Sequence, residues 1–301
     1  MRVADLTVPD RCLVMGIVNV TEDSFSDGGR YLHVDAALEH AHELVAAGAD
    51  MIDIGGESTR PGATRVAAED ERARVTPVIR ALAQDGIPTS VDTMRASVAE
   101  AAAEAGVSMI NDVSGGLADP EMFRVMAQSD IPVCLMHWKT VRFGDAAGRA
   151  DHAGDVVADV RQTLDELVEK ALAAGVARDN IVLDPGLGFA KSREDNWALL
   201  HALPTLLEGE FPMLVGASRK RFLAGVRRER AATPEAAAAV HPTEADPATA
   251  AVTAISAQMG AWGVRVHDVA VSRDAVDVAA LWNSAGVYRG EGHQSRSGVR
   301  G

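Results

Sequence analysis

Polar side chains able to bind or orient a ligand recur along this chain, each near the end of a short apolar run. They are Asn19, Asp53, Asp92, Asn111, His137, Asp184, Ser218 with Lys220, and Arg265 with His267. Any one of them alone is as typical of a turn or a helix cap as of a ligand contact. Because they follow eight successive runs, they predict one shared site if the runs are strands whose ends converge.

The acids and amides of this set indicate recognition of a flat ring. Asp92, Asn111 and Asp184 have short side chains suited to the N–H and C=O edges of a heterocycle. A carboxylate can accept two parallel N–H bonds from an amidine-like edge. A glycosidase-like pair of carboxyl groups is the competing interpretation, since the sequence does not set the distance between the carboxyl groups.

The basic residues indicate an anionic ligand. Three stretches, "ESTRPG" at 57–62, "GASRKRF" at 216–222 and "RVHD" at 265–268, place Thr59, Arg60, Ser218, Arg219, Lys220, Arg265 and His267 beside the ends of apolar runs. The net charge of −14 argues against binding nucleic acid or an anionic membrane, so an anion would need such a local basic cluster. Arg219 and Arg221 could equally pair with acids on neighbouring loops.

The elements that position these residues alternate between short strands and longer helical patterns. The eight apolar runs are 13–18, 51–54, 88–91, 108–110, 132–136, 181–183, 212–215 and 263–266. Between the first two, Leu38, Ala41, Leu44 and Val45 share a helical face, which Asp35 can cap and Gly48 can end. Runs that are apolar throughout are typical of parallel strands buried on both faces.

The repeated pattern predicts the α/β class and a single (β/α)8 TIM barrel, with a doubly wound open sheet as the alternative. The segments "AGADMIDIGG", "AGVSMINDVSGG" and "AGVARDNIVLDPG" repeat one helix-end, strand and polar-turn unit. We expect one domain over residues 1–288 and a disordered tail over 289–301. Polar insertions at 144–154 and 227–246 interrupt the alternation.

Other features bound the class of protein. Cys12 and Cys134 lie in or beside apolar runs and are expected to be buried core residues rather than a disulfide or metal pair. No apolar stretch reaches 18 residues and no signal peptide is evident, which favours a cytoplasmic enzyme. Trp197, Trp262 and Trp282 lie in or beside helical patterns and are expected to serve packing rather than stacking on a ligand.

Eight motifs together resemble the dihydropteroate synthases. They are "MGIVNVTEDSFSDGG", "GGESTRPGA", "SVDT", "INDVSGG", "LMH", "LDPGLGFAK", "GASRK" and "RVHDV", in order from Met15 to Val269. The resemblance implies a TIM barrel, usually a homodimer, that joins 7,8-dihydropterin-6-ylmethyl diphosphate to 4-aminobenzoate with the help of Mg²⁺. It also implies that sulfonamides compete with aminobenzoate.

The resemblance further implies roles for residues at matching positions. Asn19 would bind magnesium. Asp92, Asn111, Asp184 and Lys220 would hold the pterin, and Met136, Phe189 and Gly216 would line its slot. Thr59, Arg60, Arg265 and His267 would face the diphosphate, and Pro61, Phe189 and Ser218 the aminobenzoate. Catalytic roles would fall to Asp27, Lys220, Arg265 and His267.

A mobile cover is also implied. The C–O bond to diphosphate would break before the amine attacks, and the resulting pterin cation must be kept from water. The loop from Thr21 to Tyr31 would close over the site together with the loop from Ser58 to Thr64. Phe25 would shield the amine pocket and Asp27 would lie near the cation.

The sequence departs from the usual motifs of this family at two places, and two rival functions stay open. Glu22 stands where related proteins often have proline, and "LMHWKT" lacks the usual glycine after the histidine, which leaves the role of His137 open. A pterin-dependent methyltransferase domain would share the barrel and the pterin-reading acids, but not the pairing of "SRK" with "ESTRPG". An inactive paralogue that only binds pterin would not need the anion-binding residues.

Overall fold

The computed structural model describes residues 1–21, 30–57, 66–140, 152 and 154–285. Its strands are parallel and hydrogen-bonded in the order β6-β5-β4-β3-β2-β1-β8-β7. They are β1 (Leu13–Asn19), β2 (Met51–Gly55), β3 (Thr89–Asp92), β4 (Met109–Asp112), β5 (Val133–Met136), β6 (Ile181–Asp184), β7 (Leu214–Val215) and β8 (Gly263–Val266). Each lies within one residue or two of a predicted run.

Closure of the sheet distinguishes the barrel from a doubly wound sheet. A parallel bridge between Leu183 and Met213 joins β6 to the start of β7. The main-chain carbonyl of Met213 also accepts a 3.0 Å hydrogen bond from the Trp262 N–H, just before β8. The predicted (β/α)8 barrel is therefore confirmed, and the open-sheet alternative is wrong.

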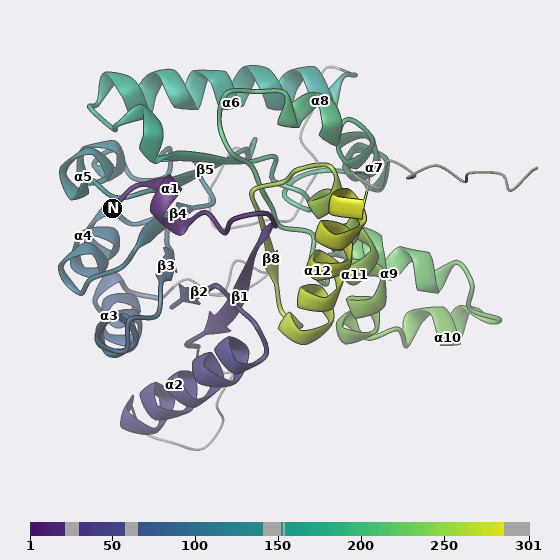
Figure 1. The fold of residues 1–301 in the computed structure, drawn as a ribbon, viewed down its shortest axis with the longest axis horizontal. Helices are drawn as coiled ribbons and strands as arrows, with labels where there is room; N and C mark the ends of the chain where they lie inside the picture. The colour runs from purple at the N-terminus through teal and green to yellow at the C-terminus, as the bar shows by residue number, and fades with distance from the viewer. Residues whose placement is uncertain (22–29, 58–65, 141–151, 153, 286–301) are drawn as a thin grey trace, which may run out of the picture.

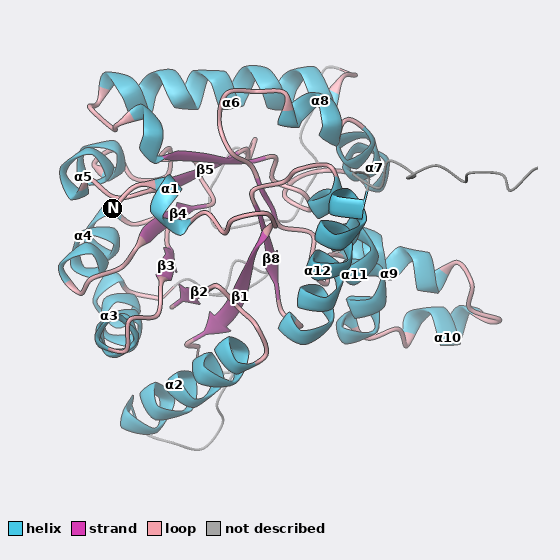
Figure 2. Ribbon diagram, in the orientation of Figure 1, coloured by secondary structure: helices cyan, strands magenta, loops and turns pink. Residues whose placement is uncertain are grey.

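The helices surround the strands, as Figures 1 and 2 show. The longer ones that follow successive strands are α2 (Arg30–Ala46), α3 (Ala68–Gln84), α4 (Ala96–Glu104), α5 (Met122–Ser129), α6 (Val156–Ala173), α7 (Arg193–His201), α9 (Arg221–Arg228) and α12 (Val269–Ala285). The others are α1 (Val3–Leu6), α8 (Leu203–Leu207), α10 (Pro234–Ala238), α11 (Asp246–Gln258) and the short 3₁₀ helices η2 (Arg178–Asn180) and η3 (Pro242–Ala245). The predicted insertion at 227–246 thus forms the end of α9, then α10 and η3, at the right-hand edge of Figure 1.

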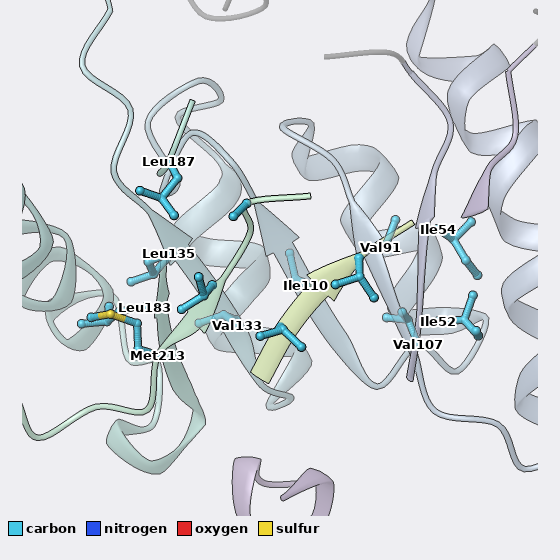
Figure 3. Close-up of a cluster of buried hydrophobic side chains, with 14 of the residues drawn as sticks. Ile52, Ile54, Val91, Val107, Ile110, Val133, Leu135, Leu183, Leu187 and Met213 are labelled. Carbon is cyan, nitrogen blue, oxygen red and sulfur yellow. The ribbon is translucent and has the colours of Figure 1, made fainter. Parts of the chain in front are cut away.

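Two apolar layers hold the barrel together. The larger fills the space between strands and helices and includes Ile52, Val91, Ile110 and Leu135 (Figure 3). The smaller lies inside the barrel, where α1 packs its Val3 and Leu6 side chains against inward residues of the strands. Continuous burial on both faces explains why the strands read as unbroken apolar runs.

Two details differ from the sequence-based expectations. Helix α2 begins at Arg30, so Asp35 lies inside the helix and does not cap it. Trp282 is 71% exposed on α12 and does not pack in the core, whereas Trp262 is buried. A periodic pattern shows which face of a helix is apolar, but it does not show whether another chain covers that face.

Other expectations are met within the described residues. Cys12 and Cys134 are buried and free. Gly48 follows α2 with φ of +106°, the left-handed conformation of a helix C-terminus. No described helix combines the length and the apolar composition that crossing a membrane requires. The predicted tail at 289–301 and most of the insertion at 144–154 lie outside the described residues.

Candidate active site

The upper interior of the barrel is polar because of the register of the strands. Alternate residues of a strand share a face, so a residue two positions after an inward apolar side chain also points inward. The pairs are Met51 and Asp53, Met109 and Asn111, Cys134 and Met136, Val182 and Asp184, and Leu214 and Gly216. Predicted substrate-binding residues from four strands are thus brought into one layer at the carboxyl ends.

Arg265 of β8 links two carboxylates across this layer. Its Nε donates to Asp53 Oδ2 at 2.6 Å, and its Nη2 donates to Asp92 Oδ2 at 2.9 Å. Asp53 is completely buried, and its other oxygen accepts from Ser90 Oγ and, at 3.3 Å, from Asn111 Nδ2. Buried charges are stable only with such partners. The layer is therefore a charge-paired network joining β2, β3, β4 and β8.

Burial changes how the two predicted pterin-binding acids titrate. It raises the pKa of Asp92 to about 7, although the Arg265 guanidinium opposes the rise. Burial also raises the pKa of Asp184, and the Lys220 ammonium opposes this. Burial thus favours the neutral form of both carboxyl groups, and the Arg265 and Lys220 charges favour the ionised form that accepts hydrogen bonds.

Lys220 is inserted between Asp184 and an aromatic ring. Its Nζ lies 4.8 Å from the centroid of the Phe189 ring and donates to the Leu187 carbonyl. A Cβ built on Gly216 would lie 3.4 Å from Asp184 Oδ2 and 3.8 Å from Lys220 Nζ. Gly216, Asp184 and the Lys220 ammonium are therefore neighbours. Burial lowers the pKa of Lys220 to about 8, although the Asp184 carboxylate opposes this change. Asp184 and Lys220 are thus brought together as predicted.

Glycines are required in the turn that follows Asp184. Gly186 has φ of +68°, and a Cβ there would lie 1.9 Å from the His137 carbonyl oxygen. The Gly186 N–H donates to Asp184 Oδ1 at 2.6 Å, which orients the carboxylate. Gly188 has φ of +79°, and a Cβ there would lie 2.6 Å from Lys220 Cδ. Only glycine allows this approach of the backbone to the Lys220 side chain.

An apolar wall borders the polar layer. Met136 packs in a cluster with Met94, Val113 and Trp138, against which Phe189 is partly buried. The Trp138 and Phe189 rings lie 5.1 Å apart between centroids and are tilted by 59°. Met136 and Phe189 therefore lie where a flat ring bound at Asp184 would need apolar neighbours.

Ser218 and His267 form a pair at the carboxyl ends of β7 and β8. The Ser218 Oγ lies 2.9 Å from His267 Nδ1, and the His267 main-chain N–H donates to the same Oγ at 3.1 Å. The adjacent Arg219 instead pairs with Asp246 through two 2.8 Å hydrogen bonds. Of the two interpretations of Arg219, the ion pair is confirmed.

Asn19, the predicted magnesium ligand, ends β1 opposite Gly55 of β2. A Cβ added at Gly55 would lie 3.4 Å from Asn19 Oδ1 and 3.8 Å from Asp92 Cβ. The amide oxygen thus lies on the same side of the barrel as the carboxylates, at the strand ends.

Part of the predicted site lies outside the described residues. These positions are Asp27, Thr59, Arg60 and Pro61, with Glu22 and Phe25 of the first loop. Their roles and the mobile cover stay predictions.

Lys191 is a partly buried neighbour of the site that the sequence-based set lacks. Its Nζ lies 2.9 Å from His137 Nδ1 and donates to the carbonyls of Gly186 at 2.9 Å and Phe189 at 3.3 Å. Burial lowers the pKa of Lys191 to about 7, and the Lys220 charge adds to this. Burial, reinforced by Lys191, lowers the pKa of His137 to about 3. Lys191 is the last residue of the motif "LDPGLGFAK", and this position could have indicated that it lies beside the site.

A second buried network supports the end of β2. The Arg95 guanidinium pairs with Glu57 and Glu71 and donates to the Val66 carbonyl at 2.6 Å, and Thr93 Oγ1 donates to Glu71 at 2.6 Å. It holds the two ends of the segment from Glu57 to Val66 together. The residues are too far apart in the chain for motif reading to pair them.

Comparison with known proteins gives the same family by sequence and by structure. The family model described as "Pterin binding enzyme" matches residues 15–267. A dihydropteroate synthase of Mycobacterium leprae (strain TN) is 48% identical over 274 residues, which are 91% of this chain and 94% of that protein.

Two solved structures have the same fold. The dihydropteroate synthase of Xanthomonas albilineans with 4-aminobenzoic acid superposes with a TM-score of 0.80 at 43% identity, covering 92% of this chain and 94% of that one. The dihydropteroate synthase of Yersinia pestis in a sulfonamide drug complex superposes with a TM-score of 0.82 at 39% identity. The match covers 91% of this chain and 95% of that one. The chain belongs to the dihydropteroate synthase family of pterin-binding enzymes.

Proposed function

We propose that the protein condenses 7,8-dihydropterin-6-ylmethyl diphosphate with 4-aminobenzoate, giving 7,8-dihydropteroate and diphosphate. The observation that carries the proposal is the grouping of Asp92, Asn111, Asp184 and Lys220 at the carboxyl ends of the strands of a chain in this family. Active sites of TIM barrels lie at this end.

The pterin would bind across the polar layer. Asp184 would accept two parallel N–H bonds from the amidine-like edge of the ring, and Lys220 would donate to an acceptor on the same ring. Asn111 offers both a donor and an acceptor, while Asp92 is held by Arg265 at 2.9 Å. Met136 and Phe189 would contact the faces of the ring.

The aminobenzoate would lie toward Phe189 and Ser218. The X. albilineans relative was solved with this acid, and the Y. pestis relative with a sulfonamide drug. We infer that the same pocket here accepts both. The aromatic amine is largely unprotonated at neutral pH, so the mechanism requires no strong general base, and Ser218 and His267 already bond to each other at 2.9 Å.

Departure of diphosphate is the step that needs most stabilisation. Arg265 and His267 at the end of β8 would bind the developing negative charge, together with Thr59 and Arg60. The Asn19 amide oxygen fits Mg²⁺, which prefers hard oxygen ligands and is commonly shared between one or two protein groups and substrate phosphates. When bound there, Mg²⁺ would neutralise charge on the leaving diphosphate.

Measurement of diphosphate release tests the function. Purified protein with the pterin diphosphate and magnesium, with and without 4-aminobenzoate, should release diphosphate and form dihydropteroate when the amine is present. Tight pterin binding without turnover would favour an inactive paralogue. The comparisons name synthases and do not favour a pterin-dependent methyltransferase domain.

Lys220 provides a test of the predicted catalytic charge through pH. Because its pKa is about 8, the ammonium loses its proton as pH rises above that value, and kcat/KM should fall on the alkaline side. In Lys220→Arg the side chain stays protonated, so the alkaline fall should move to higher pH even if the maximum is lower. An unchanged alkaline limb in this variant would show that another group causes the fall.

We also propose a homodimer formed through α11 and α12. In the described part of the chain, five of the eight large apolar side chains that are exposed lie on these helices, and a sixth directly follows α11: Ile255, Val271, Val278, Leu281 and Trp282, with Met259 after α11. The two helices pack side by side (Figure 1), so the residues can form one surface. Exposed apolar patches of this kind are typical of protein interfaces.

A cytoplasmic location, expected from the sequence, is kept as part of the proposal.

Sedimentation tests the dimer. Leu281→Asp, at a side chain 69% exposed, should give a monomer at micromolar concentration while the parent chain sediments as a dimer. Leu117→Asp is the matched control, because Leu117 is 42% exposed but lies away from both helices. A monomeric parent chain would reject the proposal.

A further inference from the structure

Three side chains with metal-binding atoms converge beside the end of β5. His137 directly follows β5, His152 precedes α6, and Asp159 lies in the first turn of α6. One ligand atom from each lies within 4.8 Å of the others. None of the three has a role in the proposed condensation.

The ligand atoms of this trio are close enough together to share a cation. Asp159 Oδ2 lies 3.3 Å from His137 Nε2 and 2.7 Å from His152 Nδ1. Ligand atoms around a tetrahedral ion with bonds of about 2.0 Å are roughly 3.3 Å apart. The His137–Asp159 distance matches this separation, and the shorter His152–Asp159 contact is a hydrogen bond that a bound ion would replace.

Hydrogen bonding within the described residues leaves both rings incompletely satisfied. His137 is fully buried and His152 is 6% exposed, yet the Nε2 atom of each is buried without a hydrogen-bond partner there. Buried polar atoms are normally paired, and an orphan is a reason to look for a missing partner. For His137 the unpartnered atom is the one that faces Asp159, whereas His152 faces Asp159 with Nδ1.

Neighbouring lysines orient the ligands. Lys139 Nζ lies 2.8 Å from Asp159 Oδ1, which leaves Oδ2 to the imidazoles. Lys191 Nζ lies 2.9 Å from His137 Nδ1, so the ring is held with Nε2 toward the trio. These contacts fix the positions of the ligand atoms, whereas the outer groups at most protein metal sites accept a hydrogen bond from the histidine. The lysines also add positive charge, which lowers affinity relative to a site without lysines.

We propose that His137, His152 and Asp159 bind a divalent cation of the zinc class. Two imidazole nitrogens and one carboxylate oxygen suit Zn²⁺ or Co²⁺, whereas Mg²⁺ prefers oxygen ligands alone. When His137 binds through Nε2, the ring loses the proton there to solvent, and Lys191 passes a proton to Nδ1 so that the imidazole stays neutral. The ion would join the start of α6 to the end of β5. The proposal does not depend on the condensation reaction.

Calorimetry with a defined metal tests the site. Tag-free full-length protein, treated with chelator and dialysed, is titrated with ZnCl₂. We expect one equivalent to bind to the parent chain, and a loss of affinity of more than about tenfold in His152→Gln. The thermal unfolding temperature should rise with zinc concentration in the parent chain and stay constant in the variant.

His42→Gln is the matched control. His42 also lies near a carboxylate, with Nε2 at 3.0 Å from Asp85, but on the surface and without a second histidine at that carboxylate. The His42→Gln variant should bind zinc with the same affinity and stoichiometry as the parent chain. Asp159→Asn should weaken binding too, but it also removes a partner of Lys139, so His152→Gln is decisive.

Cobalt provides a spectroscopic readout. Co²⁺ bound by the trio should give visible absorption bands of a low-coordinate nitrogen and oxygen site, absent from His152→Gln. Equal zinc affinity and stoichiometry in the parent chain and His152→Gln would overturn the proposal.

Discussion

Replacing Arg265 by methionine is expected to lower the free energy of unfolding by about 3–5 kcal/mol, the usual range when one partner of a buried ion pair is removed. Methionine keeps much of the apolar stem but none of the donors. Asp53, which is completely buried, and Asp92 would lose hydrogen bonds of 2.6 and 2.9 Å from the guanidinium. Chemical denaturation followed by circular dichroism measures the loss.

The loss should depend on pH with a defined sign. The pKa of Asp92 is already raised from 3.8 to about 7, and removal of the guanidinium raises it further. A group whose pKa is raised by folding contributes stability below its unfolded pKa and loses this contribution as pH rises through its folded pKa. Arg265→Met should therefore be least destabilised near pH 4 and increasingly so through pH 7 and above.

Two further variants separate charge from packing. Asp92→Asn combined with Arg265→Met should recover part of the loss, because the amide does not need a counterion. Arg178→Met breaks an exposed pair with Glu210, in which the side chains are 56% and 64% exposed, and should change stability little. Equal losses in Arg265→Met and Arg178→Met would show that the interior network is not important for folding.

The barrel was predictable because each strand carries a complete local signal. A strand buried on both faces is an apolar run, and the polar residue that ends it marks the end of the barrel where a site forms. Runs at 51–54 and 263–266 became β2 (Met51–Gly55) and β8 (Gly263–Val266) almost without change. The shortest strand, β7, was predicted less accurately, since only Leu214 and Val215 keep regular pairing.

What the sequence could not provide was the pairing of charges across the barrel. Asp53 was predicted only as a polar residue at a strand end, yet it is the fully buried partner of Arg265, 212 positions away. Nothing local distinguishes it from the many aspartates that cap turns. The trio of His137, His152 and Asp159 was missed for a related reason: its members come from a strand end, an insertion and a helix, without the regular spacing of a zinc motif.

Changing Asp184 to asparagine is expected to reduce kcat/KM by about ten- to a hundredfold, because a hydrogen bond to a charged group contributes about 1.5–3 kcal/mol. The substitution preserves shape, and the amide oxygen can still accept from the Gly186 N–H, now at 2.6 Å. What is lost is the negative charge that faces Lys220 and the ability to accept two bonds from one ring edge. Steady-state kinetics with the pterin diphosphate as the varied substrate measures the effect.

The control must show that the loss comes from ring recognition and not from damage to a strand end. Asp112 is also fully buried at the end of a strand, and it accepts from the main-chain N–H groups of Ser114 at 2.7 Å and Gly116 at 3.0 Å. Asp112→Asn should therefore disturb a comparable turn without removing a predicted pterin contact. If both variants lose the same efficiency, the effect is structural, and if Asp184→Asn keeps the parent value, Asp184 is not part of the pterin site. A loss confined to Asp184→Asn would mean that the barrel's polar layer recognises the ring through this carboxylate, since neither the shape of the side chain nor its backbone contact has changed.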